Sequence, residues 1–167
     1  MFKNLIAILS VMLSVAGFGV SAQVLAGDWI VGSVSIRSDA GRNVYGEYLS
    51  LFLVSEENPV SAKQCLAETN HQRKVDCINN CHLDFYKRFQ QKQQQPGYLI
   101  AQTVTSATGN FAFLDVPPGN HFVLVKFPAL IDGYKVAWQE PVTVTPGRIG
   151  VVTLDEENLA LPKNRRR

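Results

Sequence analysis

The stretch TSATGNFAFLDVPPGNHFVLV, residues 105–125, constrains the fold of this chain more than any other part of the sequence. It contains two apolar-rich segments separated by turn residues. Gly109 allows a hairpin turn, and Pro117-Pro118-Gly119 ends a strand, because proline cannot donate to a ladder and glycine accepts a positive φ. Phe111 and Phe113 lie two residues apart, so both point to one side of a strand. The unit therefore predicts two sheets with a core between them.

The same β pattern extends on both sides of a long interruption. Residues 29–54 contain two alternating segments separated by the turn cluster SDAGRN, and residues 98–154 contain several short segments separated by Gly and Pro turns. The segment 121–127 is apolar on both faces, which predicts a central strand. Short strands at this spacing predict a mainly β fold, an antiparallel β-sandwich. We expect residues 23–57 and 98–156 to form its two parts.

Residues 58–97 interrupt the β pattern and have a helical one. Asn58-Pro59 is typical of an N-cap followed by proline at the first helical position. Apolar and aromatic side chains then recur at intervals of four, three and four residues, at Ile78, His82, Phe85 and Phe89. Pro96-Gly97 is a strong stop signal. Because this segment is far longer than an ordinary loop between strands, it predicts an inserted α-helical hairpin.

Three segments resemble the carboxypeptidase regulatory-like domain, within the transthyretin-like (prealbumin-like) β-sandwich group. They are WIVGSVSIRSDAGRNVYGEYLSLFLV, TVTSATGNFAFLDVPPGNHFVLVKFP and GYKVAWQEPVTVTPGRIGVVTL. The order G-N-F-A-F…V-P-P-G-N-H-F-V-L in the second resembles the family's G-x-F-x-F…L-P-P-G-x-Y-x-L core. The resemblance covers about two-thirds of residues 23–167 and implies a transthyretin-like accessory sandwich without catalysis. The helical insertion departs from the family pattern, which has a short connection there.

Residues 1–22 have the pattern of a secretory signal peptide. Lys3 gives a positive start, Leu5 to Val15 form an apolar core that is short for a membrane span, and Val20-Ser21-Ala22 resembles a cleavage site. We expect removal after Ala22 and a periplasmic or secreted protein. An uncleaved membrane anchor is the alternative.

Charge is nearly balanced, with 16 basic and 14 acidic residues. Lys163 and Arg165 to Arg167 concentrate basic charge in the last five residues. We expect residues 157–167 to form a basic disordered tail. A near-neutral body with such a tail lacks the basic surface of a nucleic-acid-binding protein, so no nucleic-acid partner is expected.

All three cysteines, Cys65, Cys77 and Cys81, lie in the helical insertion. In an exported protein this predicts a disulfide. Cys65 can face either Cys77 or Cys81, and such a bond would stabilise the fold by roughly 3 kcal/mol. The odd cysteine is then free, or pairs with a partner or with a second copy in a covalent homodimer.

The stretch CINNCH offers an alternative chemistry. It is one residue longer than the C-x-x-C-H haem attachment motif. In a c-type cytochrome, Cys77 and Cys81 would form the thioether bonds and His82 would be the proximal ligand. A zinc site is not expected, because adjacent Cys81 and His82 are poorly spaced for tetrahedral coordination.

The sequence contains no motif typical of a known enzyme class. We therefore expect an exported, non-enzymatic β-sandwich that binds or scaffolds an unidentified protein or cell-envelope polymer. The insertion is the expected binding surface, with Phe85, Tyr86 and Phe89 as candidate contacts. Carbohydrate binding is a second alternative, because aromatic faces suit sugar rings. Its candidate residues, which could equally be core aromatics, are Trp29, Tyr134 and Trp138.

Overall fold

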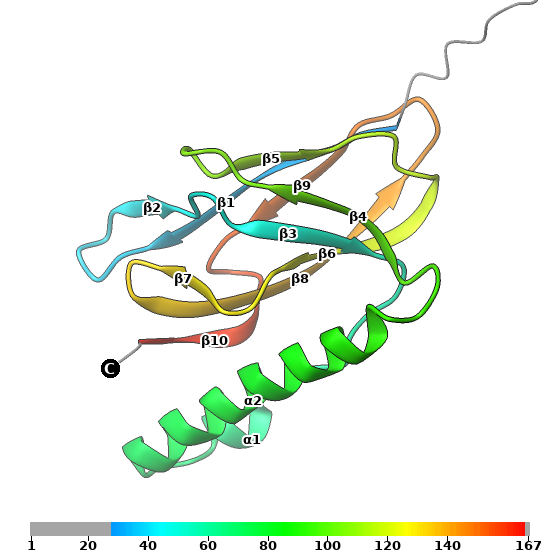
Figure 1. Cartoon of the computed structure of the whole chain (residues 1–167). Helices are drawn as coiled ribbons and strands as arrows, with labels where there is room; N and C mark the ends of the chain where they lie inside the picture. The colour runs from blue at the N-terminus through cyan, green and yellow to red at the C-terminus, as the bar shows by residue number, and fades with distance from the viewer. Residues whose placement is uncertain (1–27, 166–167) are drawn as a thin grey trace, which may run out of the picture.

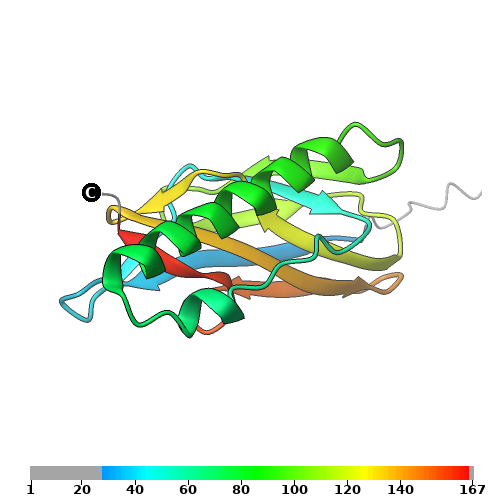
Figure 2. The ribbon, with the colours of Figure 1, turned by 90° about the horizontal axis from the view of Figure 1, so that it is seen from below.

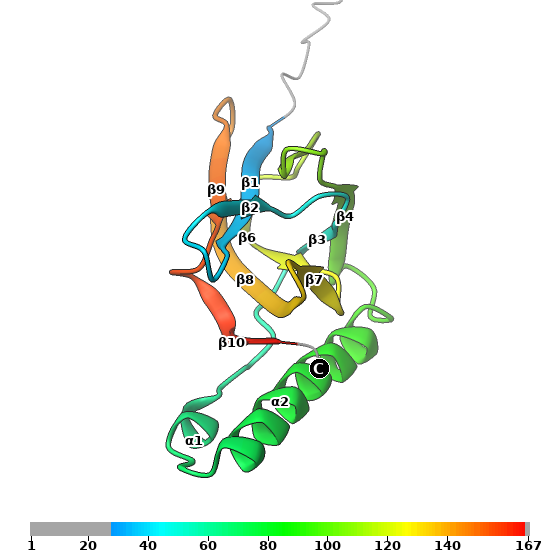
Figure 3. The same ribbon diagram turned by 90° about the vertical axis from the view of Figure 1, so that its left-hand side faces the viewer.

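The computed structural model describes residues 28–165, so the expected signal peptide lies outside the described residues. Two β-sheets face each other, and a long helix lies against the outside of one of them (Figures 1 and 3). The smaller sheet contains β1 (Ile30–Arg37), β2 (Asn43–Tyr45), β5 (Asn110–Phe113) and β9 (Gly150–Leu154). The larger contains β3 (Ser50–Val54), β4 (Leu99–Val104), β6 (Gly119–Val125), β7 (Ala129–Ile131), β8 (Tyr134–Val144) and β10 (Leu159–Arg165).

The strand pairing confirms the expected mainly β sandwich. In the larger sheet the order is β10-β8-β6-β3-β4, with β7 also paired to β8, and every pairing is antiparallel. In the smaller sheet β1 pairs antiparallel with β2 and β5. The pairing of β1 with β9 is parallel, which departs from the antiparallel sandwich that the sequence pattern predicts.

Alternating side chains from both sheets fill the space between them. Phe111 and Phe113 point into this core as predicted, and their rings meet edge to face at 5.8 Å. The strand order also confirms the central position of β6, which lies between β3 and β8. Val123 and Val125 face the core between the sheets, whereas Leu124 faces the helix. Apolar residues on both faces of β6 therefore serve two separate cores.

The inserted helical region consists of a single-turn α1 (Lys63–Leu66) and a long α2 (His71–Lys92). Asn70 caps α2, because its side-chain oxygen accepts a 3.0 Å hydrogen bond from the Arg73 backbone N–H. The expected N-cap at Asn58 is wrong, since Asn58 is fully buried before α1 and its side chain donates to the Phe85 carbonyl. In residues 28–165 neither helix has both the length and the apolar character needed to cross a membrane.

The prediction of a disordered tail is also wrong for residues 159–165, which form β10 at the edge of the larger sheet. Leu161 is fully buried between this strand and α2. The basic side chains have acidic and aromatic partners: Lys163 pairs with Glu156 and Arg165 with Asp39, and both cations lie over the Tyr134 ring. The concentration of basic charge predicted a solvated tail, but two of these partners, Asp39 and Tyr134, lie far away in the sequence.

Candidate functional site

Helix α2 covers the outer face of the larger sheet and runs diagonally across its strands (Figure 2). Phe89 contacts Phe52 at 4.8 Å and Tyr98 at 6.2 Å between ring centroids. Phe85 and Phe89 are only 3% and 4% exposed. Both rings were predicted as partner contacts, but they belong to the core beneath the helix. Tyr86 is half-buried and packs against Phe127 at 5.2 Å.

Polar contacts fix the segment that leads into the helices. The Asn58 backbone N–H donates to Gln139 Oε1 at 2.7 Å, and Gln139 Nε2 donates to the Asn58 carbonyl at 3.0 Å. Asn58 Nδ2 donates to the Phe85 carbonyl of α2 at 2.9 Å. The helical insertion is therefore joined to β8 by hydrogen bonds as well as by apolar packing, which makes it part of the folded body.

His82 is fully buried between α2 and β10. Its Nε2 lies 3.1 Å from the Pro162 carbonyl, so this nitrogen carries the proton and donates. Nδ1 is buried and has no hydrogen-bond partner within the described residues. Burial lowers the pKa of His82 below its ordinary value, and the positive charge of Lys135 acts in the same direction. The hydrogen bond to Pro162 opposes this shift only in part.

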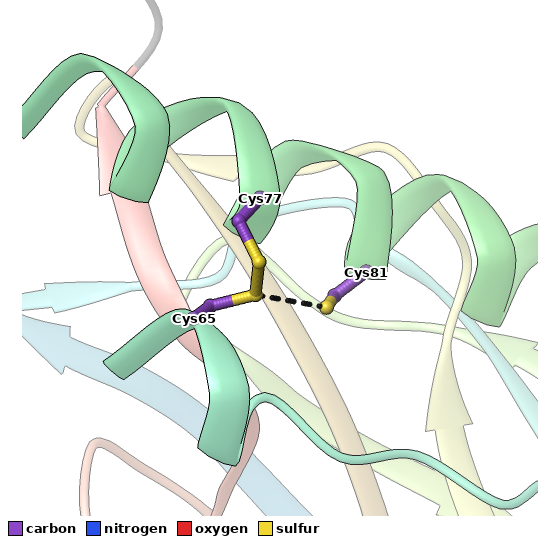
Figure 4. A group of neighbouring side chains, drawn as sticks. All are labelled: Cys65, Cys77 and Cys81. Carbon is purple, nitrogen blue, oxygen red and sulfur yellow. Dashed lines mark hydrogen bonds between the residues drawn. A yellow bond between two sulfur atoms is a disulfide. The ribbon is translucent and has the colours of Figure 1, made fainter. Parts of the chain in front are cut away.

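The three cysteines meet where α1 faces α2 (Figure 4). Cys65 and Cys77 form a disulfide, which is one of the two pairings that the sequence left open. Cys81 is free and half-buried. Its sulfur lies 3.4 Å from Cys65 Sγ and donates weakly to the Ser61 carbonyl at 3.7 Å. The haem hypothesis fails on this geometry, because Cys77 is already bonded to Cys65 and the His82 ring faces β10.

The outer face of the smaller sheet differs, since no helix lies over it within residues 28–165 (Figure 3). Val31 lies beside Ala112 on one neighbouring strand and Val151 on the other. Val151 is 74% exposed, and side chains adjoining this row are also exposed, at 44% for Trp29, 57% for Leu114 and 59% for Ile149. These residues form an exposed apolar cluster at one end of the sheet.

A polar row follows the apolar one along the same face. Ser33 pairs with Asn110 and Thr153, and Ser35 pairs with Tyr45, whose side chain is 50% exposed. We call this surface the bare face. It comprises Trp29, Val31, Ser33, Ser35, Tyr45, Asn110, Ala112, Leu114, Ile149, Val151 and Thr153, and none of these side chains is charged.

The structure separates the three aromatic residues proposed for carbohydrate binding. Trp138 is fully buried, and its indole Nε1 donates to the Asp155 carbonyl at 2.7 Å. Tyr134 is 8% exposed, and its hydroxyl donates to Asp39, a bond that raises the pKa of Tyr134. Trp29 alone of the three lies on the bare face. The sequence did not identify Tyr45 as a candidate. Its place on the bare face follows from the pairing of β1 with β2, in which Tyr45 lies opposite Ser35.

Comparisons with known proteins give weak structural likenesses only. No family model matches the sequence, and no curated protein matches it. A candidate carbohydrate binding protein from Pseudomonas aeruginosa is 17% identical, with 81% of this chain and 92% of that chain covered and a TM-score of 0.44. The minor pilin GBS52 of Streptococcus agalactiae is 9% identical, with 86% and 46% covered and a TM-score of 0.45.

The major pilin SpaD of Corynebacterium diphtheriae is 10% identical, with a TM-score of 0.40. The match covers 83% of this chain and 32% of the pilin. The chain thus spans less than half the length of either pilin. At these identities and scores the matches assign no ligand or partner to this chain.

Proposed function

We propose that this chain is an exported, non-enzymatic sandwich of the carboxypeptidase regulatory-like kind that binds another cell-envelope or extracellular macromolecule through the bare face. The observation that carries this proposal is the contrast between the two outer faces. Helix α2 buries apolar side chains on one, whereas Trp29, Leu114, Ile149 and Val151 stay exposed together on the other. Exposed apolar clusters of this kind mark interaction sites on soluble proteins.

The cysteines support the exported part of the proposal. A disulfide between Cys65 and Cys77 persists in oxidising compartments and is rare in a reducing cytosol. The signal-peptide pattern of residues 1–22 points the same way. We therefore propose a periplasmic or secreted protein. A homodimer linked through Cys81 stays a prediction of the same proposal.

A neutral polysaccharide is a second candidate for the partner, favoured by the order of residues on the bare face. Trp29 offers an aromatic surface on which a sugar ring can stack, and Tyr45 offers another toward the opposite end. The hydroxyl and amide groups of Ser33, Asn110 and Thr153 lie between them. Uncharged donors and acceptors beside apolar groups match a sugar, which has hydroxyls at its edge and C–H groups on its face.

The experiment compares two sets of variants for retention on insoluble polysaccharides and for cross-linking to cell-envelope components. Trp29→Ala and Val151→Ser alter the bare face, and Leu83→Ala alters an exposed apolar residue on α2 as the matched control. We expect loss of binding in the first two variants and full binding in the third. Retention on polysaccharide identifies the sugar candidate, and protein cross-links identify a protein partner. Binding that survives both bare-face substitutions contradicts the proposal.

A further inference from the structure

We propose that Cys65, Cys77 and Cys81 form a single thiol–disulfide exchange site, in which the disulfide moves between Cys65–Cys77 and Cys65–Cys81. This inference goes beyond the proposed binding function and does not depend on it. Cys81 Sγ lies 3.4 Å from Cys65 Sγ, which is already bonded to Cys77. All three sulfur atoms lie within 4.8 Å of one another (Figure 4). A free thiol in contact with a disulfide sulfur is the starting arrangement for exchange.

The step balances without an oxidant or a reductant. The Cys81 thiol first gives its proton to water or buffer, and the resulting thiolate attacks Cys65 Sγ. A bond forms between Cys81 and Cys65 as the bond between Cys65 and Cys77 breaks. Cys77 leaves as a thiolate with the electron pair and then takes up a proton. One disulfide and one thiol are present before and after the exchange.

The fold can accommodate both disulfides with little movement. A disulfide bond is about 2.05 Å long, so closing the 3.4 Å gap between Cys65 and Cys81 requires a shift of about 1.4 Å. Cys77 and Cys81 are one helical turn apart on α2 and both face α1, where Cys65 lies (Figure 4). Either bond therefore links the same two helices, and the exchange leaves the insertion closed.

The position of the free thiol changes with the exchange. In the structure the thiol belongs to Cys81, which lines a small surface cavity together with Pro59, Val60, Gln64 and Arg88. After exchange it belongs to Cys77, one turn closer to the start of α2. Cys77 and Cys81 are both half-buried, so neither position is sealed from an alkylating reagent when it carries the free thiol. A reagent thus distinguishes the two forms by the cysteine that it labels.

The first experiment follows the labelled position in the wild-type protein. The protein is held at about pH 5, where few thiols are ionised, then shifted to about pH 8 and alkylated with N-ethylmaleimide after increasing delays. Tandem mass spectrometry of the 75–87 peptide after reduction locates the label. We expect one label per chain, at Cys81 in some molecules and at Cys77 in others, because the two pairings interconvert. Labelling confined to Cys81 at every delay contradicts the exchange.

The second experiment uses two matched variants that each retain two cysteines. Cys81→Ser keeps the disulfide seen in the structure, and Cys77→Ser leaves only the pairing that exchange requires. After export under the same conditions, we expect both folded variants to contain no thiol that N-ethylmaleimide can label. Two reactive thiols in folded Cys77→Ser contradict the proposal. The wild-type time course decides the matter if that variant does not fold.

Discussion

The two outer faces of the sandwich carry similar apolar side chains, but those on one face are buried and those on the other are exposed. On the larger sheet, Val54 and Leu124 are buried beneath α2 together with Phe85 and Phe89, and the partly buried Phe52 packs against them. On the smaller sheet, Val31, Val151 and their apolar neighbours have no such cover within residues 28–165. The contrast shows that the helical insertion is mainly a structural layer. We propose that a partner binds on the opposite side of the molecule, at the bare face.

This division moves the expected binding surface away from the insertion. Phe85, Tyr86 and Phe89, in a segment with helical spacing, were expected to contact a partner, because a long insertion into a sandwich is often functional. In the structure, the same spacing orients these residues toward the sheet. An apolar stripe on one helix indicates what the helix covers and gives no information about which macromolecule it binds.

The largest expected effect comes from removing the covering layer. Phe89→Ala should lower the free energy of unfolding by about 3–5 kcal/mol, because it leaves a cavity between α2 and the larger sheet. Leu83→Ala, on the exposed side of the same helix, should cost less than about 0.5 kcal/mol. Urea denaturation followed by circular dichroism measures both values. Equal effects of the two substitutions would contradict the burial of the larger sheet beneath α2.

The next effect concerns the covalent link within the insertion. Cys65→Ser removes the cysteine shared by both possible disulfides and should lower the free energy of unfolding by about 3 kcal/mol. Cys81→Ser keeps the Cys65–Cys77 bond and should change it by less than about 1 kcal/mol. Denaturation without reductant gives the difference. Similar stability of the two variants would show that the disulfide contributes little to the attachment of the helices.

Periodicity along the chain was enough to predict most of the fold. Alternation and turn residues located β1, β5 and β6 and indicated that β6 is central. Such patterns can be recognised in a short window of sequence, because the alternation of apolar and polar residues shows which side of a strand is buried. The edge strand β10 was missed because its basic residues find their partners in distant segments, as Arg165 does with Asp39. Long-range pairing of this kind leaves no local signal.

The candidate site was less predictable for a related reason. Cysteine spacing predicted a disulfide, but only the placement of α1 against α2 chose Cys77 over Cys81. Burial separated Trp138 from Trp29, two residues that look alike in the sequence. The bare face depends on strand register, because its residues come from four strands that are separated along the chain. No sequence motif indicated the register between these strands.

A smaller effect on stability should depend on pH and should arise on the covered side, at His82. Because burial holds the pKa of His82 below its ordinary value, the folded protein resists protonation that the unfolded chain accepts at about pH 6.5. The unfolded state then binds more protons, so stability should fall as pH falls from about 7.5 to 5.5. His82→Gln should flatten this dependence relative to wild type. Thermal denaturation across this pH range measures it, and an unchanged slope in the variant contradicts the assignment to His82.

Substitutions on the bare face should have the smallest effect on stability and, under the proposed function, the largest effect on binding. Trp29→Ala and Val151→Ser should each change the free energy of unfolding by less than about 0.5 kcal/mol, because their side chains are exposed in the isolated chain. A partner would bury the same side chains, so binding should fall at least about tenfold in each variant, as for the central residues of an interface. Urea denaturation and binding isotherms on the same preparations separate the two quantities. A large loss of stability would mean that these residues already pack within the chain, and the bare face would then be a second structural surface.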